Sequence, residues 1–452
     1  MGPLGDNNLL FNSGAYKATI IMGKLVDDDK DGVKFRGVVS LNDLYSNFSI
    51  HQSIHNSYMT LTIHISESKL ILERFGTKGL QGEEFVQIKF ETPTMDVIED
   101  LFYVTGYGPI NKDSHDLQTG MVLRCVSKEK LINDQITVNQ SFTGSTSKIA
   151  SLLYNNHLQG ALYKTMKTGG SQYWKEKKIF IDDSIGSEQI IIPGLTPFTA
   201  MHFLAVRSFG GAKHPGSFFS FYEASDGFHF SNIENWDNKK LETKYTYNSD
   251  AKGLQPYHKD YFYNIRYMSP LVIKNTLAGI QNGEYATKVT AIDHYKKSFT
   301  VTKYDIMKDR SKFNTLEKTF NMSSKFFDMF GKDPTEETIV IDSTTNYKHI
   351  PQIVSKRQAY IQMLQHYTFN IVVNGDSSLT AGKVITLDIK EAGAPVKKNK
   401  GSMYSGNWMI INCEHICDRD LFTTRLTIVR DGLKFTHGEK QVDMSDVFRG
   451  DV

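Results

Sequence analysis

The feature that most restricts how this chain folds is a strand pattern that occurs twice, over residues 82–131 and again over 382–434. Each stretch begins with a glycine and continues with an alternating strand, EFVQIKF in the first and KVITLDI in the second. An aromatic strand follows, LFYVTGYGPI or NWMIINCEHI, and then MVLRCVSKEKLI or TRLTIVRDGLKF. Phe102 and Trp408 occupy matching places. A repeated order of this kind predicts a duplicated β domain.

Other alternating segments extend both copies. Runs such as YMTLTIHIS switch between apolar and polar residues, which predicts half-buried strands of an antiparallel sandwich or barrel. The 28 Phe and 22 Tyr, against only 11 Pro, suit extended structure. We expect strands over 16–24, 33–40, 58–65, 84–91, 100–106, 121–127, 261–268 and 285–304, and four closing strands in TFNIVVNG, GKVITLDIKEAG, NWMIINCEHICD and FTTRLTIVRDGLKF.

Between the two copies the pattern is mixed. Ser145 is a candidate helix cap, because apolar residues near helical spacing follow it. Residues 306–345 are charged and are interpreted as an inserted segment with short helices. We expect helices over 145–158, 197–208 and 355–367, and a hairpin around Ser225-Asp226-Gly227.

We therefore predict an α+β fold dominated by β structure, with two similar antiparallel β-barrel tube domains and α+β domains inserted between them. The 452 residues are enough for two to four domains. The expected division is a flexible arm over 1–14, a first β-barrel over 15–135, a middle α+β domain over 136–250, a second β-barrel over 251–305 and 355–440, an inserted segment over 306–354 and a tail over 441–452.

Charge and cysteine content exclude some classes of protein. A formal net charge of +2 argues against a dedicated nucleic-acid binder, which usually shows a clear basic excess. The three cysteines, Cys125, Cys413 and Cys417, are too few and too scattered for a disulfide framework and fit a reduced history. No apolar run is long enough to span a membrane, and the first residues lack the features of a signal peptide.

The stretch LVDDDKDGVKFRG begins like an EF-hand calcium loop, with Asp27, Asp29, Asp31 and Gly32 in place. The twelfth position of such a loop needs a bidentate Glu, but it is Val38 here. Both flanks read as strands, and Asp-Gly between strands predicts a hairpin turn, since glycine adopts positive φ without steric cost. We expect a solvated turn and no calcium site.

Three short motifs imitate the serine β-lactamase set, namely Ser145-x-x-Lys148, Tyr154-x-Asn156 and Lys167-Thr168-Gly169. In that fold the motifs come from well-separated parts of a large domain, whereas here they lie close together in the sequence. Ser145 also stands where a helix cap is expected. We therefore expect no catalytic residue, and a serine hydrolase using Ser145 and Lys148 is kept as an alternative.

Cys413, His415 and Cys417 alternate along one strand and share one of its faces. A zinc site needs a fourth ligand and usually a turn that wraps the metal, so a core or subunit contact is the preferred interpretation. The sequence has no dinucleotide-binding, P-loop, zinc-protease or nucleophile-elbow motif. We predict no cofactor-binding residue and no metal-binding residue.

The segment LTAGKVITLDI, preceded by RQAYIQMLQHY and VVNGDSS, resembles the end of the baseplate central hub proteins of contractile-tailed bacteriophages, a family shared with the N-terminal part of type VI secretion spike proteins. Leu379, Thr380, Gly382 and Ile385 lie in matching places. GNWMIINCEHICDRDLFTTRLTIVRDGLK resembles the closing strand pair of that family, and IHISESKLILERFGTKGLQGEEFVQIKFETP with YVTGY resembles its first β domain. IPGLTPFTAMHFLAVRSFG with SFFSFYEASDGFHF resembles its middle domain, whereas the insertion over 306–350 departs most.

The resemblance implies a homotrimeric ring in which each subunit supplies two tube-like β domains, so that a threefold spike is joined to a sixfold tail tube. It implies that the hub binds the central spike protein on one face and tail-tube initiator or tube proteins on the other. The lumen would hold tape-measure protein and pass DNA in transit. The implied location is the tail baseplate of the virion, after synthesis in the host cytoplasm and without membrane insertion. No enzymatic activity, cofactor or metal belongs to this role.

Alternative functions stay open. The hub part of a type VI-like contractile injection spike belongs to the same mechanical class. In those systems hub and spike are often fused, whereas this chain ends at Val452, soon after the closing strand pair. A carbohydrate-binding module is an alternative of another class, and exposed, coplanar Trp174, Trp236 and Trp408 would favour it over the hub.

Overall fold

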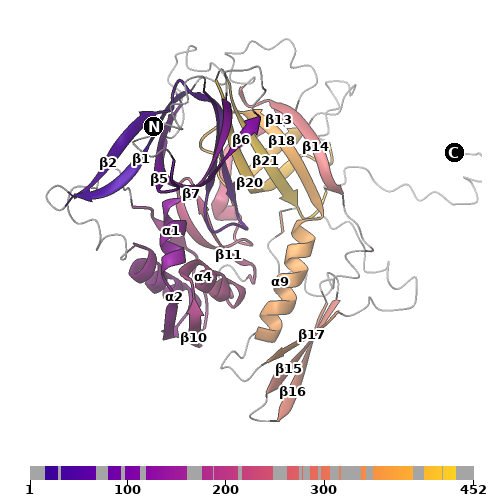
Figure 1. The fold of residues 1–452 in the computed structure, drawn as a ribbon. Helices are drawn as coiled ribbons and strands as arrows, with labels where there is room; N and C mark the ends of the chain where they lie inside the picture. Colours follow the sequence, from indigo (N-terminus) through magenta and orange to yellow (C-terminus); the bar gives the residue numbers. More distant parts are fainter. Residues whose placement is uncertain are drawn as a thin grey trace, which may run out of the picture.

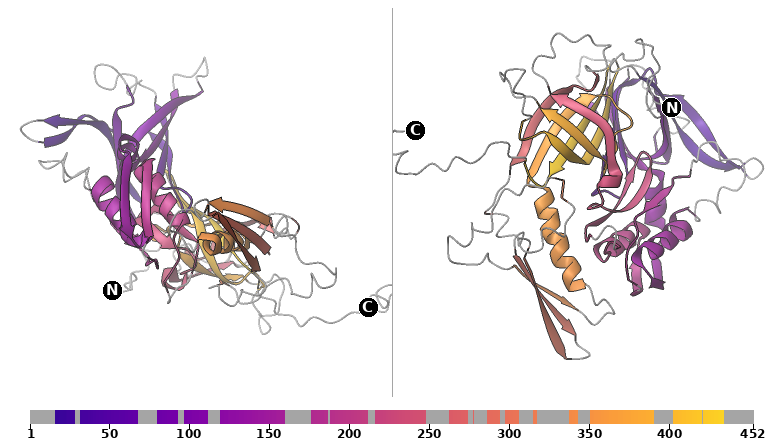
Figure 2. Two further views of the ribbon diagram at one scale, coloured as in Figure 1. Left: turned by 90° about the horizontal axis from the view of Figure 1, so that it is seen from below. Right: turned by 180° about the vertical axis from the view of Figure 1, so that it is seen from behind.

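The computed structural model describes residues 16–28, 32–67, 80–92, 97–111, 119–159, 176–186, 188–211, 216–247, 262–273, 277, 286–293, 297–305, 315–316, 337–342, 350–389, 402–419 and 421–433. One large sheet arches over a smaller α+β region (Figure 1). A long helix and a small three-stranded sheet extend below the other half of the large sheet, beside the α+β region (Figures 1 and 2). Within the described ranges, no helix is both long and apolar enough to cross a membrane.

The large sheet contains thirteen strands. They are β1 (Lys17–Asp28), β2 (Gly32–Ser40), β3 (Tyr45–Ser53), β4 (Thr60–Glu67), β5 (Glu84–Glu91), β6 (Ile98–Asn111), β7 (Thr119–Ser127), β13 (Lys240–Tyr247), β14 (Ile265–Ile273), β18 (Tyr367–Asn374), β19 (Val384–Ile389), β20 (Gly406–Asp418) and β21 (Phe422–Arg430). The main path runs β14-β18-β21-β20-β3-β4-β7-β6-β5-β1-β2, and β19 joins β20 to β13. Every pair in this sheet is antiparallel except β13 with β19.

Twelve of these strands form two six-stranded units with the same strand order, and β2 lies beside the first of them. We call β3-β4-β7-β6-β5-β1 the first unit and β14-β18-β21-β20-β19-β13 the second unit. The chain visits equivalent strands in the same sequence, with β2 added in the first unit and an insertion between β14 and β18 in the second. The units differ at one end, because β1 is antiparallel to β5 while β13 is parallel to β19. The duplication predicted from the sequence is thus confirmed at the level of strand order.

The duplication extends to the register of single residues. Phe102 of β6 opposes Val86 of β5, and Trp408 of β20 opposes Ile385 of β19. Thr105 and Ile411, at the same distance beyond them, are both left out of the ladders with β7 and β21. These matching β-bulges bend β6 and β20 at the same place. The glycines that precede β5 and β19, Gly82 and Gly382, also share a φ of +83°.

The α+β region lies below the first unit (Figure 1). Its elements are α1 (Lys128–Gln135), β8 (Val138–Gly144), α2 (Thr146–Leu153), a π-helical turn η2 (Tyr154–Gln159), β9 (Ile179–Ile181), β10 (Glu188–Leu195), α4 (Pro197–Val206), β11 (Phe219–Ala224), β12 (Gly227–Asn232) and a short 3₁₀ helix η3 (Asp237–Lys239). β8 pairs with β10, and β11, β12 and β9 form a second sheet. Every residue of β11 and β12 is buried, because helices cover one face and the large sheet covers the other.

The last group consists of α9 (Ile350–Leu364), β15 (Ala286–Asp293), β16 (Ser298–Asp305) and β17 (Glu337–Asp342). β15 pairs antiparallel with β16 and parallel with β17, and α9 contacts β15. The other end of α9 packs on the second unit, where Ala359, Tyr360 and Met363 share a core with Met409 and Val429. The helix therefore links the small sheet to the large one (Figure 2).

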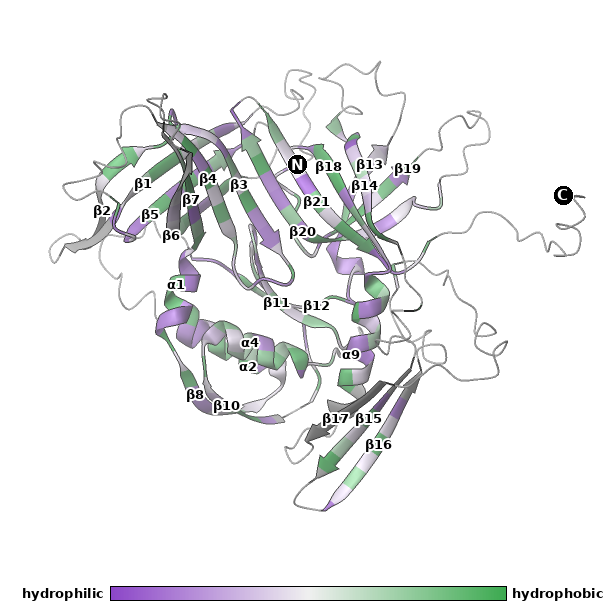
Figure 3. Ribbon diagram, turned by 45° about the vertical axis from the view of Figure 1, so that its right-hand side comes forward, coloured by the Kyte–Doolittle hydropathy of each residue, from purple (hydrophilic) through white to green (hydrophobic). Residues whose placement is uncertain are grey.

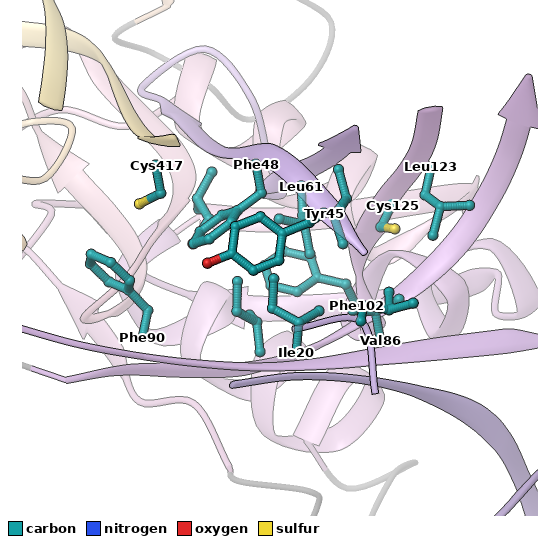
Figure 4. Close-up of a cluster of buried hydrophobic side chains, with 14 of the residues drawn as sticks. Ile20, Tyr45, Phe48, Leu61, Val86, Phe90, Phe102, Leu123, Cys125 and Cys417 are labelled. Carbon is teal, nitrogen blue, oxygen red and sulfur yellow. The ribbon is translucent and has the colours of Figure 1, made fainter. Parts of the chain in front are cut away.

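Each unit has its own apolar core, which follows from the alternation of apolar and polar residues along the strands (Figure 3). Figure 4 shows the core of the first unit, in which Ile20, Phe48 and Phe102 point toward one another. Cys417 and Phe422, which come from the second unit, belong to this same core. The two units therefore share buried surface as well as a sheet.

The structure confirms most of the expected strands and helices and corrects others. The β-dominated α+β fold is confirmed, and the two-barrel arrangement stays a prediction. The strand β3 was not expected, because the sequence YSNFSIHQS is mostly polar. The expected helix over 145–158 is present as α2 and η2, and the hairpin at Ser225 is present as β11 and β12. Residues 1–14, 29–31, 306–314, 317–336 and 441–452, which figured in the sequence predictions, lie outside the described residues.

Candidate assembly interface

The two units are joined through β20, which belongs to both. Its first part pairs with β19 of the second unit, from Gly406 to Met409. Beyond the bulge at Ile411 it leaves β19 and pairs antiparallel with β3, from Asn412 opposite Ser53 to Asp418 opposite Asn47. We call this ladder between β20 and β3 the internal seam. The bulge redirects the strand from one neighbour to the other.

Side chains add contacts between the two units at the internal seam. Phe422 of β21 packs edge to face against Phe90 of β5, with 4.7 Å between the ring centroids. The hydroxyl of Tyr16 donates to the carbonyl of Asp418. Arg419 donates from Nε to the carbonyl of Tyr45 at 3.0 Å. A hydrogen-bonded ladder with a dry aromatic core on one side makes this a firm contact between units.

His415 lies in the middle of the internal seam, opposite Ile50. Its side chain is fully buried, with Nδ1 3.3 Å from the hydroxyl of Thr424 and Nε2 3.6 Å from the sulfur of Cys413. Burial lowers the pKa of His415 to about 4, so the ring is neutral near pH 7. Burial also raises the pKa of the Cys413 thiol well above its ordinary value, which keeps this cysteine protonated.

The last part of β6 is the counterpart of the seam-forming part of β20, but it has an open edge. β5 covers one edge of β6 only as far as Tyr103, while β7 covers the other edge to Asn111. Among the described residues, no strand lies against β6 where β3 lies against β20. Tyr107, at this edge, keeps 49% of its surface exposed.

β14 is the counterpart of β3 and also has an open edge, at the outer side of the large sheet (Figures 1 and 3). Tyr267 and Leu271 are each 59% exposed, and Val272 is 45% exposed. Large apolar side chains on an edge strand are usually avoided, since they invite pairing with another chain. The duplicated sheet therefore leaves two complementary edges, β6 and β14, at the places that the internal seam occupies between the units.

A buried cluster of charges ties the first unit to the α+β region. Glu223 of β11 accepts hydrogen bonds from the backbone N–H of Met59 at 2.8 Å and from the hydroxyl of Ser127 at 2.6 Å. Lys177 forms ion pairs with Glu223 and Asp100. Lys128 and Glu129 of α1 complete the cluster, with Lys128 Nζ 3.1 Å from Asp100 and 2.8 Å from Glu129.

The cluster holds three carboxyl groups and two ammonium groups, so one proton would make it neutral. Burial raises the pKa of Glu223 to about 7, despite its ion pair with Lys177. Burial also acts on Asp100, but the charges of Lys128 and Lys177 outweigh it and hold the pKa of this carboxyl below its ordinary value. Glu223 is therefore the member of the cluster that takes up the proton.

Ser145 and Lys148, the two residues on which the serine hydrolase alternative depends, lie at the N-terminal end of α2. Ser145 is the N-cap of α2, and its Oγ accepts from the backbone N–H of Lys148 at 3.4 Å. The same hydroxyl lies 3.1 Å from Ser147 Oγ. Lys148 takes part in this bond through its backbone N–H. Residues 167–169, the third motif of that alternative, lie outside the described residues.

The other residues singled out in the sequence lie in cores. Cys413, His415 and Cys417 share one buried face of β20, and within the described residues no group of three potential ligands could hold a metal ion. Trp408 is fully buried and donates from Nε1 to the carbonyl of Tyr404 at 2.9 Å. Trp236 packs against the core that α9 shares with the second unit. Trp174 and residues 29–31 of the acidic turn lie outside the described residues, while Asp27 and Gly32 belong to the paired strands β1 and β2.

The sequence matches no protein-family model and no curated protein. Its structure is similar to that of the tail protein from Neisseria meningitidis MC58, with a TM-score of 0.53 and 13% identity over 93% of this chain and 98% of that one. The prophage MuSo2 43 kDa tail protein from Shewanella oneidensis aligns with a TM-score of 0.49 and 9% identity over 92% and 97% of the two chains. A type VI secretion component of E. coli, the c3393 protein, aligns with a TM-score of 0.39 and 10% identity over 88% and 76%. The resemblance is thus confirmed at the level of the fold, because this chain has the fold of the Neisseria meningitidis tail protein over nearly its whole length.

Proposed function

We propose that this chain is the central hub of a contractile phage tail baseplate, in which three copies form a ring between a threefold spike and a sixfold tail tube. The observation that carries the proposal is the pair of equivalent six-stranded units, joined edge to edge by the internal seam. Three such chains contain six equivalent units. Such a ring has threefold symmetry, and its six similar units are arranged with approximate sixfold symmetry.

Backbone contacts at the ends of the two units support the proposal that each is a tube domain. In the second unit a bridge between Thr246 and Asn264 brings the end of β13 beside the start of β14. In the first unit the N–H of Leu41 donates to the carbonyl of Ile20 at 2.9 Å, which brings the end of β2 beside β1 just before β3 begins. We propose that the domains follow the boundaries given by the sequence, 15–135 for the first tube domain and 251–305 with 355–440 for the second.

The proposed partners follow from the same role. One face of the ring would hold the central spike protein, the other would meet tail-tube initiator or tube proteins, and the lumen would contain tape-measure protein and pass DNA. The proposed location is the baseplate of the virion. A mechanical role without enzymatic activity is supported by Ser145, whose hydroxyl caps α2. The buried Trp408 and its bond to Tyr404 argue against a carbohydrate platform at that residue.

Light scattering after size-exclusion chromatography tests the proposal. The expected mass is that of three chains of 51.3 kDa. Electron micrographs of the same fraction should show rings with a central opening and six similar lobes. A chain that stays monomeric at high concentration, or that forms only closed dimers, would contradict the hub role.

A further inference from the structure

We infer that the contact between α9 and β11 is a pH-sensitive latch, which holds α9 and its small sheet against the α+β region at neutral pH and releases them on acidification. We call α9 with β15, β16 and β17 the arm, and the contacts of Arg357 with the start of β11 the latch. The inference goes beyond the proposed function, because it requires neither a ring nor a partner protein.

The arm is anchored in a core at one end. Ala359, Tyr360 and Met363, in the C-terminal half of α9, lie in the core that this helix shares with the second unit. The opposite end of α9 carries the small sheet, beside the α+β region (Figures 1 and 2). Arg357 comes just before the anchored half in the sequence. The anchored half can therefore serve as a pivot, and the latch decides whether the rest of the arm lies against β11.

The latch is made by one cationic side chain on backbone carbonyl groups. Nη1 of Arg357 donates to the carbonyl of Phe219 at 2.7 Å and to the carbonyl of Ser217 at 3.4 Å. The guanidinium carbon also lies 5.0 Å from the centroid of the Phe218 ring. Carbonyl groups and the face of an aromatic ring both favour a positive charge. Further positive charge placed nearby would weaken these contacts, because like charges repel most strongly where little water screens them.

Two histidines lie close enough to the latch for its charge to act on them. His55 follows β3 in the loop toward β4, and the half-buried His202 belongs to α4. Nε2 of His202 lies 2.6 Å from the hydroxyl of Ser57, in the same loop as His55. Burial, and after it the positive charge of Arg357, lower the pKa of both histidines. Both rings are therefore neutral at pH 7 and above, on the side of the latch that faces away from the arm.

The coupling between Arg357 and the histidines acts in both directions. Because the charge of Arg357 opposes protonation of His55 and His202, a proton on either ring must oppose the contact of Arg357 with β11 by the same free energy. When the arm moves away, its charge leaves with it, and the histidines bind protons more readily. The open arrangement therefore gains as the pH falls below the ordinary histidine value of 6.5.

Glu234 is the carboxyl group that faces the latch. It accepts from the backbone N–H of Ser217 at 2.6 Å and of Phe218 at 3.1 Å, and its charge attracts Arg357. Burial raises the pKa of Glu234 to about 7, so this group takes up its proton before the histidines do. Since burial causes the rise, that proton favours the closed arrangement. The opening on acidification must therefore come from the two histidines.

The arm itself contributes two further polar groups near the latch. Nζ of Lys356 lies 5.5 Å from the centroid of the Phe209 ring, and its charge acts on Glu234. Burial raises the pKa of Tyr360 well above its ordinary value, which keeps this phenol neutral. Once Glu234 is neutral and both rings are protonated, the latch holds four cations without a compensating carboxylate, namely His55, His202, Lys356 and Arg357.

Distances between spin labels, measured by double electron–electron resonance at pH 8 and pH 5, test the latch. One label is placed by Phe299→Cys on β16 of the arm and the other by Ile191→Cys on β10 of the α+β region. These native side chains are 72% and 66% exposed. The matched control carries Leu152→Cys and Ile191→Cys, which both lie in the α+β region. The native cysteines, Cys125, Cys413 and Cys417, are buried and do not compete for the label.

The expected result is one short distance at pH 8 and a second, longer distance at pH 5. The ratio of long to short should rise at least about tenfold, which is the effect of a shift of one pKa unit at a single histidine. The control pair and the far-ultraviolet circular dichroism should not change with pH. A wild-type distance that is the same at pH 8 and pH 5 would overturn the latch.

Substitutions in the labelled chain assign the switch to its residues. His55→Gln together with His202→Gln should keep the short distance at pH 5, whereas Arg357→Gln should give the long distance at both pH values. Glu234→Gln should still open on acidification. His51→Gln, at a half-buried histidine on which Glu414 and not Arg357 acts, is the matched control and should open like wild type. Opening of the double histidine variant as in wild type, or a closed Arg357→Gln chain, would overturn the inference.

Discussion

The rings of Phe90 and Phe422 meet edge to face, 4.7 Å apart, although one belongs to the first unit and the other to the second. Both side chains are fully buried. The Phe422 ring also lies directly over Gly375, where an added Cβ would come within 1.9 Å of the ring. This aromatic contact adds to the ladder between β20 and β3 in holding the two halves of the sheet together.

Replacing Phe422 with alanine should therefore loosen both units together. The expected loss in the free energy of unfolding is about 3–5 kcal/mol, because a buried ring leaves a cavity shared by two cores. Denaturant titration followed by fluorescence and by circular dichroism measures this. Phe299→Ala is the matched control on an exposed site and should cost little. A loss under about 1 kcal/mol for Phe422→Ala would show that the units do not depend on this contact.

Gly82 and Gly382, which precede β5 and β19, allow the cost of backbone strain to be compared between the two units. Gly82 and Gly382 both have φ of +83°, so alanine at either should cost about 1–2 kcal/mol from the left-handed backbone alone. A Cβ at Gly382 would also lie 2.1 Å from the Tyr222 hydroxyl, whereas a Cβ at Gly82 meets nothing within 4 Å. We predict that Gly382→Ala destabilises clearly more than Gly82→Ala. Adding Tyr222→Phe should recover part of the difference, with Tyr222→Phe alone as the control. Equal losses at the two glycines would mean that Tyr222 moves aside freely.

The Glu223 cluster should make stability fall as the pH rises through neutrality. Burial raises the pKa of Glu223 to about 7 in the folded chain, above its ordinary value of 4.5. A raised pKa means that the folded state binds the extra proton, so this contribution is full below pH 4.5 and is lost as the pH rises through about 7. The slope contributed is at most one proton, roughly 1.4 kcal/mol per pH unit.

Denaturation of wild type and Glu223→Gln at several pH values between 4.5 and 8 measures this slope. In Glu223→Gln the slope of stability against pH should be smaller by the contribution of one proton. Burial also raises the pKa of Glu234 to about 7, so Glu234→Gln should remove a similar share, and the exposed Glu83→Gln should leave the slope intact. Identical pH profiles for wild type and Glu223→Gln would contradict the prediction.

His415 should act in the opposite direction. Burial lowers its pKa from 6.5 to about 4, so the folded state resists taking up a proton that the unfolded chain accepts. Stability from this residue is present above pH 6.5 and is lost as the pH falls toward 4. His415→Gln should flatten the acid side of the stability profile between those values, measured by urea denaturation. His64→Gln, at a half-buried place in β4, serves as the control. An acid limb that is equally steep in His415→Gln would assign the loss to other groups.

The sequence was sufficient for the repeated strands and insufficient for the contacts that join them. The alternation of Val86, Ile88 and Phe90 reveals β5, and the same alternation reveals β19, because one face of each strand is a core. The strand β3 carries no such signal. Gln52 and Ser53 are buried although they are polar, because they lie where β20 and the α+β region meet β3.

The buried charge cluster was also beyond the sequence. Asp100, Lys177 and Glu223 lie far apart in the chain, and nothing local distinguishes them from the other charged residues. Only the topology brings them together. Ser145 is the opposite case. The sequence predicts that it caps a helix, and in the structure it is the N-cap of α2. Short sequence patterns therefore predicted strands and helix caps. Contacts between residues that are distant in the sequence could be identified only from the structure.

The matched bulges at Thr105 and Ile411 have a consequence for the origin of this chain. Bulges at equivalent places in two strands of one chain are the mark of a gene for a single six-stranded unit that was duplicated and fused. Fusion keeps the two units together whatever the strength of the contact between them, so this contact can hold a buried polar residue such as His415.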